Sequence, residues 1–229
     1  MATDAPLMNP LNLLRDTWFF FSRHLLAIVV LCLPWVLLEN LAQQALKAWF
    51  AGPNSMAYGL LAGLVCYPLY SAALILLVDA RSRGLQPRTL ELLAGALRLW
   101  PSFALLTGLS TLLIMLGASL FVLPALWVMV KLAFAEYLLV LHGLSPLAAM
   151  RESMRLSKGH FGLIAVCLLA VMSPLWLFDW WGYQQLGEQP AAWQSLLLDS
   201  ALGFAQLFVT VLMFRLYMQL GQDASNVPD

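Results

Sequence analysis

Residues 123–143, LPALWVMVKLAFAEYLLVLHG, are followed directly by residues 144–161, LSPLAAMRESMRLSKGHF. The first segment is apolar and about as long as the roughly 20 residues that a helix needs to cross the hydrocarbon core of a bilayer. The second has the pattern of a short amphipathic helix and carries Arg151, Arg155 and Lys158. An apolar span followed by a basic surface helix is typical of an integral membrane protein.

The composition of the whole chain indicates the same class. Of the 229 residues, 62% are hydrophobic and 10% are charged, whereas an ordinary soluble domain has roughly 45–50% apolar and about 25% charged residues. A soluble core could not bury so much apolar surface. We therefore expect an all-α polytopic membrane helix bundle, with a single membrane domain over residues 1–220 and a short polar tail over residues 221–229.

Apolar runs along the chain predict six membrane spans. Residues 102–142 form 41 residues without a polar loop, which is too long for one span and fits two, and Gly117 and Pro124 bracket the expected reversal. Amphipathic surface helices are expected before the first span, in residues 90–100, and after the fourth span. This order repeats along the chain, so three two-span repeats and ordinary six-span spacing both remain open. The predicted spans cover residues 24–45, 56–80, 102–120, 124–142, 161–181 and 194–220.

The basic residues indicate which side of the membrane each loop faces. Ten Lys and Arg residues fall in the N-terminal segment, in the loops after spans two and four, and at the C-terminal end, whereas the opposite connections hold only Lys47. Cytoplasmic loops carry an excess of Lys and Arg, so we expect both termini in the cytoplasm. The loop and surface-helix residues expected to contact anionic phospholipid headgroups are Arg81, Arg83, Arg88, Arg98, Arg151, Arg155 and Lys158.

Four short motifs resemble a known family. They are RDTWFFF (15–21), VLP (122–124), RESMRLSKGHF (151–161) and FRLYM (214–218), in the order found in the YciC-type family of bacterial inner-membrane proteins. Span four with its basic helix is also similar to the membrane domains beside some glycerophosphodiester phosphodiesterases, where an SxxLxKGxF pattern recurs. The resemblance implies a six-span protein of the Gram-negative inner membrane, and no particular reaction. Span four departs from the family's apolar pattern because it holds two charged residues.

Lys131 and Glu136 are these two charged residues. A charge near the bilayer centre costs at least about 2.5–3.5 kcal/mol, so an intramembrane ionisable residue is a candidate for function. Five residues of helix separate their directions by roughly 140°, so the two are not expected to pair with each other. We expect inter-helix partners instead, and these complete the candidate intramembrane polar site: Asp179 or Asp199 for Lys131, and Arg215 and Asp79 for Glu136.

No motif predicts a metal site, a cofactor, an enzyme or nucleic-acid binding. The three cysteines lie in apolar spans and are expected to be packing residues, and the three histidines fall at cytoplasmic span ends without ligand spacing within one helix. Zinc-hydrolase, nucleophile-elbow and phosphate-loop motifs are absent, and there is no large excess of positive charge. Amphipathic sequence precedes the first span, which is expected to be retained rather than cleaved as a signal peptide.

Two functions remain open from the sequence. One is a non-enzymatic inner-membrane protein that supports envelope or lipid organisation, with membrane phospholipids as partners. The other is a transporter of a lipid or small solute through a polar site around Lys131 and Glu136, which prolines within the spans also favour. A continuous polar cavity that reaches Lys131 would favour transport, and a sealed core with paired charges would favour the first function.

Overall fold

The computed structural model describes residues 10–50, 55–187 and 191–225. In these ranges the chain forms helices without strands, and six helical stretches are long and apolar enough to cross a membrane. This confirms the predicted all-α polytopic bundle. The last helix continues past residue 221, where the polar tail was predicted to begin, and residues 226–229 lie outside the described ranges. The helices are α1 (Pro10–Arg23), α2 (Leu25–Trp49), α3 (Ser55–Ser82), α4 (Thr89–Leu120), α5 (Val122–Leu132), α6 (Ala135–His142), α7 (Pro146–Leu156), α8 (Phe161–Leu186) and α9 (Ala192–Ser225).

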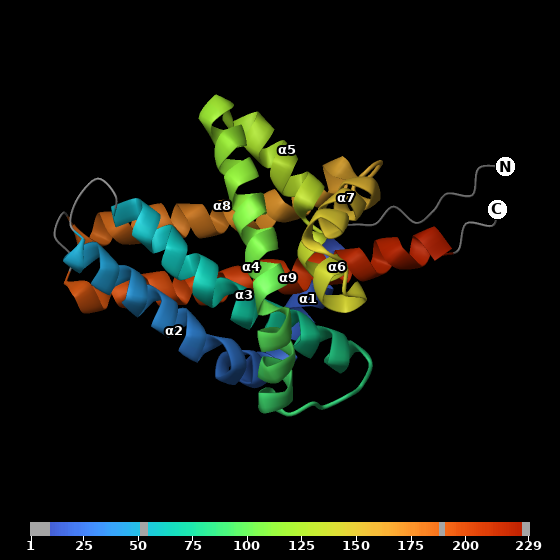
Figure 1. Cartoon of the computed structure of the whole chain (residues 1–229), viewed down its shortest axis with the longest axis horizontal. Helices are drawn as coiled ribbons and strands as arrows, with labels where there is room; N and C mark the ends of the chain where they lie inside the picture. The colour runs from blue at the N-terminus through green and yellow to red at the C-terminus, as the bar shows by residue number, and fades with distance from the viewer. Residues whose placement is uncertain (1–9, 51–54, 188–190, 226–229) are drawn as a thin grey trace.

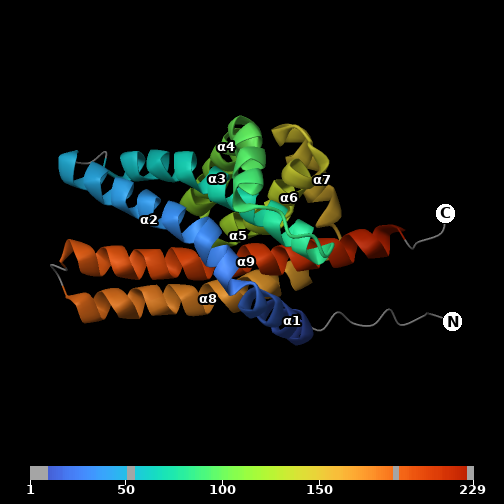
Figure 2. The same cartoon turned by 90° about the horizontal axis from the view of Figure 1, so that it is seen from below.

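The membrane helices form two groups. Helices α2, α3, α8 and α9 run along the long axis of the molecule, and α4 and α5 form a hairpin that crosses them (Figure 1, Figure 2). Helix α3 packs against α2 and α4, while α9 packs against α1, α2 and α8. Helices α1, α6 and α7 and the last part of α9 lie toward the same end of the molecule (Figure 1).

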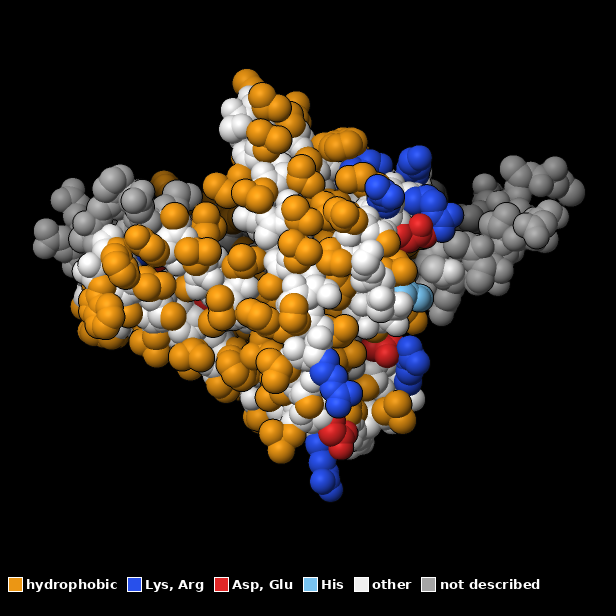
Figure 3. Space-filling model, in the orientation of Figure 1, with side chains coloured by type: hydrophobic (Ala, Val, Ile, Leu, Met, Phe, Trp, Pro, Cys, Tyr) orange, Lys and Arg blue, Asp and Glu red, His pale blue; other side chains and the backbone are white. Residues whose placement is uncertain are grey.

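The core lies where the hairpin meets the four-helix group. Leu74 and Ile75 of α3, Phe103 of α4, Phe134 beside α6 and Leu212 of α9 are fully buried there. Many large apolar side chains on the outer faces of α2, α4 and α8 remain exposed, as expected for helices whose outer faces contact lipid. Figure 3 shows Lys and Arg side chains gathered toward the right and lower edge of the visible face, and apolar side chains over the rest.

The region of span three differs from the sequence prediction in one respect. The amphipathic residues 90–100 do not form a separate surface helix but continue through Pro101 into the span as the single helix α4. Ala96 and Phe103, on either side of this proline, are fully buried, and packing of this kind allows proline inside a membrane helix. The predicted reversal is confirmed, because α4 ends at Leu120 and α5 begins at Val122.

Glycines set the ends of the surface helix α7. Gly143 has φ of +63° and ends α6, and Gly159 has φ of +86° between α7 and α8. Both values lie in the left-handed region that glycine adopts at little cost. Pro146 at the start of α7 suits a first helical turn, which needs no donor there. The chain can therefore leave span four, form α7 and turn back into α8 within a few residues at each end.

Candidate functional site

The fourth span is broken in its middle. Helix α5 ends at Leu132 and α6 begins at Ala135. The buried Ser153 hydroxyl of α7 bridges the gap: it accepts a hydrogen bond from the Phe134 backbone N–H at 3.1 Å and donates one to the Lys131 carbonyl at 2.8 Å. Irregular backbone at membrane depth is tolerated where protein satisfies it or where it lines a cavity. Ser153 supplies the first of these conditions.

Glu136 lies immediately after the break and faces α3. Its two carboxylate oxygens accept hydrogen bonds from the Tyr67 hydroxyl at 3.0 and 3.1 Å, and Oε2 also accepts one from Ser71 at 3.3 Å. The first turn of a helix, where Glu136 lies, favours a negative charge. Among the described residues no ion pair involves Glu136. Hydroxyl donors and the start of α6 therefore hold this carboxylate in place of a cation.

A cavity of about 320 Å³, which we name the central cavity, lies between the hairpin and the four-helix group. Its wall includes Ala133 at the break and Glu136 of α6 on one side, and Tyr67 and Tyr70 of α3 on the other. Ser110 of α4 and several residues of α9 also line it. The break in span four therefore also meets the second condition for irregular backbone in a membrane, because it lines a cavity.

Glu39 brings a second carboxylate to the central cavity from α2. Its Oε1 accepts a hydrogen bond from Gln43 at 3.1 Å. Its Oε2 is buried and has no well-formed hydrogen bond to the described residues. The Tyr70 side chain, which lines the same cavity, interacts with Glu39, so Glu39 lies in a polar part of the cavity wall.

A neighbouring cavity of about 370 Å³, the end cavity, lies next to the central cavity, toward the ends of α2 and α8 and the start of α9. Lys47 is the basic residue in its wall, and the Tyr183 hydroxyl donates a hydrogen bond to Asp199 at 2.7 Å. The walls of both cavities include Glu39, Tyr70, Met172, Gly203 and Gln206. Among the described residues, the two walls together hold four carboxylates and one ammonium group: Glu39, Glu136, Asp179, Asp199 and Lys47.

The six residues predicted to form one polar site lie in separate places. Glu136 lines the central cavity, Asp179 and Asp199 line the end cavity, and Lys131 lines neither. Lys131 contributes its carbonyl to the break, and the structure places no aspartate in an ion pair with it among the described residues. The expected partners were chosen by depth in the membrane alone, whereas the rotation of each helix decides which side chains meet.

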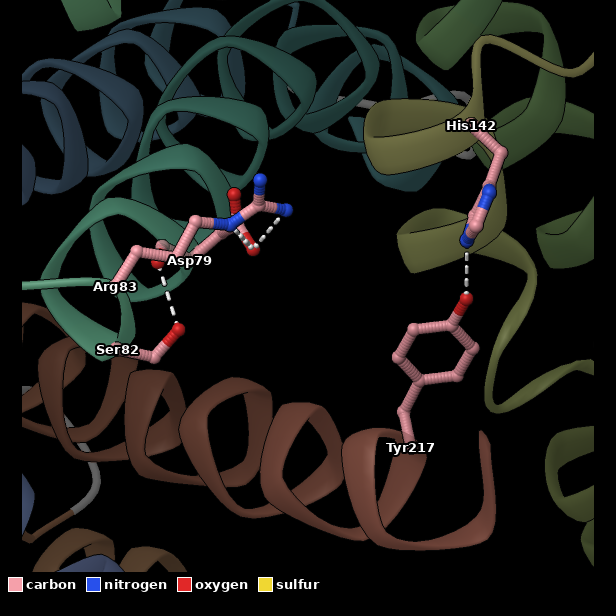
Figure 4. A network of polar contacts seen from close by, with 5 residues as sticks. All are labelled: Asp79, Ser82, Arg83, His142 and Tyr217. Carbon is pink, nitrogen blue, oxygen red and sulfur yellow. Dashed lines mark hydrogen bonds and ion pairs between the residues drawn. The ribbon is translucent and has the colours of Figure 1, made fainter. Parts of the chain in front are cut away.

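Asp79 and Arg215 lie near the opposite end of the four-helix group from the end cavity. Asp79 pairs with Arg83 at 3.0 Å, and the Ser82 hydroxyl donates to the Asp79 carbonyl at 2.7 Å (Figure 4). The Arg215 guanidinium lies 5.1 Å from the centre of the Phe20 ring. The predicted contacts of Glu136 with Asp79 and Arg215 are therefore replaced by contacts with α3.

His142 closes a contact between α6 and α9. Its Nε2 lies 2.7 Å from the Tyr217 hydroxyl, on the side of Figure 4 away from Asp79. The part of the chain that the structure describes holds no group of three His, Cys, Asp or Glu side chains arranged for a metal ion. His142 thus contributes to helix packing at the end of span four.

Two of the seven basic residues predicted to contact headgroups have acidic partners within the protein. Arg83 pairs with Asp79, and Arg155 donates from Nε to the two oxygens of Glu152 at 3.0 and 2.9 Å. The hydrogen bond from Arg155 lowers the pKa of Glu152. Contact between these seven basic residues and lipid stays a prediction.

A family model described as "Uncharacterised protein family (UPF0259)" matches residues 54–219, which is most of the chain. The chain belongs to this family. The narrower YciC-type resemblance and the similarity to glycerophosphodiester phosphodiesterase membrane domains stay predictions. No solved structure matches the chain.

Curated members of the UPF0259 family align over much of the chain. A UPF0259 membrane protein of Sodalis glossinidius (strain morsitans) is 27% identical over 173 residues, which cover 74% of this chain and 67% of the relative. UPF0259 membrane proteins of Yersinia pestis and Yersinia pseudotuberculosis are 26% identical over 159 residues, covering 69% of this chain and 61% of each relative. The chain thus spans about three fifths of the length of the Yersinia relatives. These matches establish a membrane protein and leave its activity open.

Sequence reasoning missed four residues of the site: Glu39, Tyr67, Ser71 and Ser153. Glu39 carried a usable signal, because it is an ionisable residue inside an apolar span, as Lys131 and Glu136 are. Ser153 lies in the segment predicted as an amphipathic surface helix, yet it is fully buried. The role of its hydroxyl depends on a break in the backbone of span four, and no residue pattern in that span predicts the break.

Proposed function

We propose that this protein binds a small solute that is positively charged or rich in hydrogen-bond donors in the central cavity, and moves it across the membrane. The observation that carries the proposal is the pair of adjacent cavities that share part of their walls, with Glu39 lining both and Glu136 lining the central cavity. An ionisable residue within a membrane helix is a candidate for a substrate or ion pathway. The cavities reach Glu136 rather than Lys131.

The charge of the two cavity walls supports a cationic solute. Four carboxylates face one ammonium group, Lys47, which lies in the end cavity. Glu136 is held by neutral hydroxyl donors, and Glu39 accepts a hydrogen bond from the neutral amide of Gln43. An anion would meet repulsion from all four carboxylates, whereas a cation would meet attraction at each step from the end cavity to Glu136.

The broken span supports movement. Transport proteins commonly place their binding residues on discontinuous membrane helices near the middle of the bilayer. Here the break at residues 133–134 lies directly before Glu136, and it lies in the hairpin that forms one wall of the central cavity. Rotation of α5 about this break would open or close the cavity while α3 and α9 stay in place.

Thermal unfolding of the purified full chain in detergent tests the proposal. Tetraethylammonium and putrescine serve as cationic probes, and succinate and benzoate serve as anionic ones. A cation that binds the folded state at about one hundred times its Kd adds about 2.7 kcal/mol of stability, which raises the Tm measurably. We expect a cation to raise the Tm of the wild type and of Asp16→Asn, which removes a carboxylate of α1 outside the cavities, and not that of Glu136→Gln.

Two results count against the solute-binding proposal. The first is that neither cation stabilises the wild type more than the anions do. The second is that Glu136→Gln responds to the cation as the wild type does, because Gln keeps the size of the side chain and its oxygen acceptor but not its charge. A cation that passes this test is then assayed for uptake into proteoliposomes that hold the wild type or Glu136→Gln.

A second proposal is a non-enzymatic role in envelope or lipid organisation at the bacterial inner membrane, with both termini in the cytoplasm. The gathering of basic side chains at one side of the molecule supports it (Figure 3), because such residues bind the anionic surface of a cytoplasmic leaflet. Its test is the phospholipid composition of cells with and without the protein. An unchanged lipid composition together with cation-dependent stabilisation would leave transport as the better proposal.

A further inference from the structure

A third cavity, the basic pocket, lies away from the two acidic ones, where α1 meets α2 and where α3 ends against α9. Its volume is about 710 Å³. The residues that contribute charge are Arg23, His24, Arg81, Arg83 and Arg215. Aromatic and aliphatic side chains complete the wall: Phe19, Phe20, Val78, Phe214 and Met218. Among the residues that the structure describes, no acidic side chain lines it.

The charges of the basic pocket are mostly uncompensated. Of its four arginines, Arg83 is neutralised by Asp79, at 3.0 Å. Among the described residues no ion pair involves Arg23, Arg81 or Arg215. The Nε of Arg81 is buried and has no hydrogen-bond partner there. Three guanidinium groups without an acidic partner at one wall favour the binding of an anion there.

The surroundings of His24 point to the same positive potential. Burial lowers the pKa of His24, and the charges of Arg81 and Arg23 lower it further. The Phe20 ring packs on the imidazole with 4.6 Å between ring centres, and the same ring lies under Arg215. Phe20 thus fixes the position of Arg215 at the wall of the pocket.

Helix dipoles explain only part of this arrangement. Arg23 and Arg81 lie in the last turns of α1 and α3, where a basic residue stabilises the helix end. Arg215 lies well inside α9, which continues to Ser225, so the helix end does not account for it. A helix dipole also does not explain why three guanidinium groups without ion-pair partners among the described residues line the same pocket.

We propose that the basic pocket binds a phosphate-bearing anion, with Arg81 and Arg215 as its main ligands. Planar guanidinium groups bind phosphate oxygens through paired hydrogen bonds. The apolar side chains of the wall suit the glycerol and upper acyl carbons of an anionic phospholipid. Inorganic phosphate and glycerol 3-phosphate offer the same ligand chemistry without the acyl chains.

Native mass spectrometry of the full chain with added phosphatidylglycerol tests this proposal. The double variant Arg81→Gln, Arg215→Gln removes two charges from the pocket. The control Arg151→Gln, Lys158→Gln removes two charges from α7 and the loop after it. Because each lost charge-assisted hydrogen bond weakens binding by roughly tenfold, we expect the apparent Kd to rise at least about tenfold more in the pocket variant than in the control.

The competing ligands identify the source of the phosphate. Phosphatidylglycerol that is displaced only by other anionic phospholipids assigns the pocket to a lipid headgroup. Displacement by millimolar glycerol 3-phosphate or inorganic phosphate assigns it to a soluble compound. Equal weakening in the pocket variant and the control, or no weakening in either, overturns the proposal.

A second measurement uses the wild type, in case the pocket variant does not fold. A phosphatidylglycerol analogue with a photoreactive diazirine near its headgroup is cross-linked in vesicles, and the labelled peptides are identified by mass spectrometry. We expect label on residues 19–24, 81–86 and 214–219, and its loss when unlabelled phosphatidylglycerol is added in excess. Label confined to α7, or spread evenly over the basic residues, overturns the proposal.

Discussion

The Ser153 hydroxyl is the single side chain that satisfies both backbone groups at the break in span four. A buried N–H or carbonyl that loses its partner costs about 1–3 kcal/mol. Ser153→Ala removes only the hydroxyl oxygen, and the fully buried position leaves no room for bulk water to replace it. A surface-helix serine therefore determines the geometry of a membrane span.

We predict that Ser153→Ala lowers the free energy of unfolding in detergent by about 1–3 kcal/mol. Ser119→Ala is the matched control, because Ser119 is exposed and bonds only within its own helix turn; its effect should stay within about 0.5 kcal/mol. Chemical denaturation followed by tryptophan fluorescence measures both. Equal stability of Ser153→Ala and the wild type would refute the bridging role.

His24 predicts a pH dependence of stability. Its pKa is lowered in the folded protein by burial, then by Arg81 and Arg23, so the unfolded chain, with a pKa of about 6.5, binds the proton more readily. The contribution of His24 to stability is therefore complete above about pH 6.5 and is lost as the pH falls toward the folded pKa. We expect the Tm of His24→Gln to fall less than that of the wild type between about pH 7.5 and about pH 5.5.

The origin of this effect is checked with Arg81→Gln, which removes one of the charges that lower the pKa of His24. That variant should show an intermediate pH dependence. If His24→Gln loses as much stability on acidification as the wild type, the pH dependence originates elsewhere.

At the scale of the elements, the α4–α5 hairpin is held by a close backbone approach at Gly117. A Cβ added there would lie 2.9 Å from the Ala125 nitrogen and 3.0 Å from the Ala125 Cα. Backbone atoms cannot move aside as the end of a side chain can, so α5 itself would have to shift. The hairpin, and with it one wall of the central cavity, depends on the absence of a side chain at this position.

We predict that Gly117→Ala destabilises the protein by about 1–3 kcal/mol through overpacking. Gly59→Ala is the control, because a Cβ at Gly59 meets nothing within 4 Å. Alanine is the better helix former, so the control should gain about 0.5–1 kcal/mol. Thermal unfolding measures the stability of both variants relative to the wild type. Stabilisation of similar size in both would show that α4 and α5 are not in close contact there.

Sequence reasoning predicted the elements better than their contacts. Apolar runs and the Gly117 and Pro124 signals located all six spans, because span length is set by bilayer thickness. The continuation of α4 through Pro101 could not be predicted, since it depends on the burial of Ala96 and Phe103 by other helices. The sequence identifies Glu136 as an acidic residue within the membrane. Its partners Tyr67 and Ser71 depend on the rotation of each helix about its axis. A membrane helix is apolar on most of its faces, so its sequence gives little information on that rotation.

At the scale of the whole molecule, charge is divided between two ends. The end cavity is lined by carboxylates and Lys47, and the basic pocket by arginines. The proposed orientation, with the basic end in the cytoplasm, places the end cavity toward the periplasmic side. This arrangement would draw a cation in from one side and hold an anionic group at the other.

Cysteine labelling tests this orientation. In a background with Cys32, Cys66 and Cys167 replaced by alanine, we predict that Trp49→Cys and Trp193→Cys react with a membrane-impermeant maleimide in intact spheroplasts. Both positions are exposed, at 84% and 62%. Gln86→Cys and Lys158→Cys should react only after the membrane is permeabilised. Labelling of Gln86→Cys and Lys158→Cys from different sides would exclude the six-span topology.

The break in span four also has a consequence for biosynthesis. Helix α5 has 11 residues and is about 16 Å long, half the hydrocarbon thickness of roughly 30 Å, so it enters the bilayer only together with α6. Ser153 lies in α7, which is translated after both helices. Before α7 is present, the Phe134 N–H and the Lys131 carbonyl can bond only to backbone groups of their own helix. We therefore expect the nascent span to be a continuous helix. It bends only when α7 docks, which makes the final shape of span four a late step in assembly.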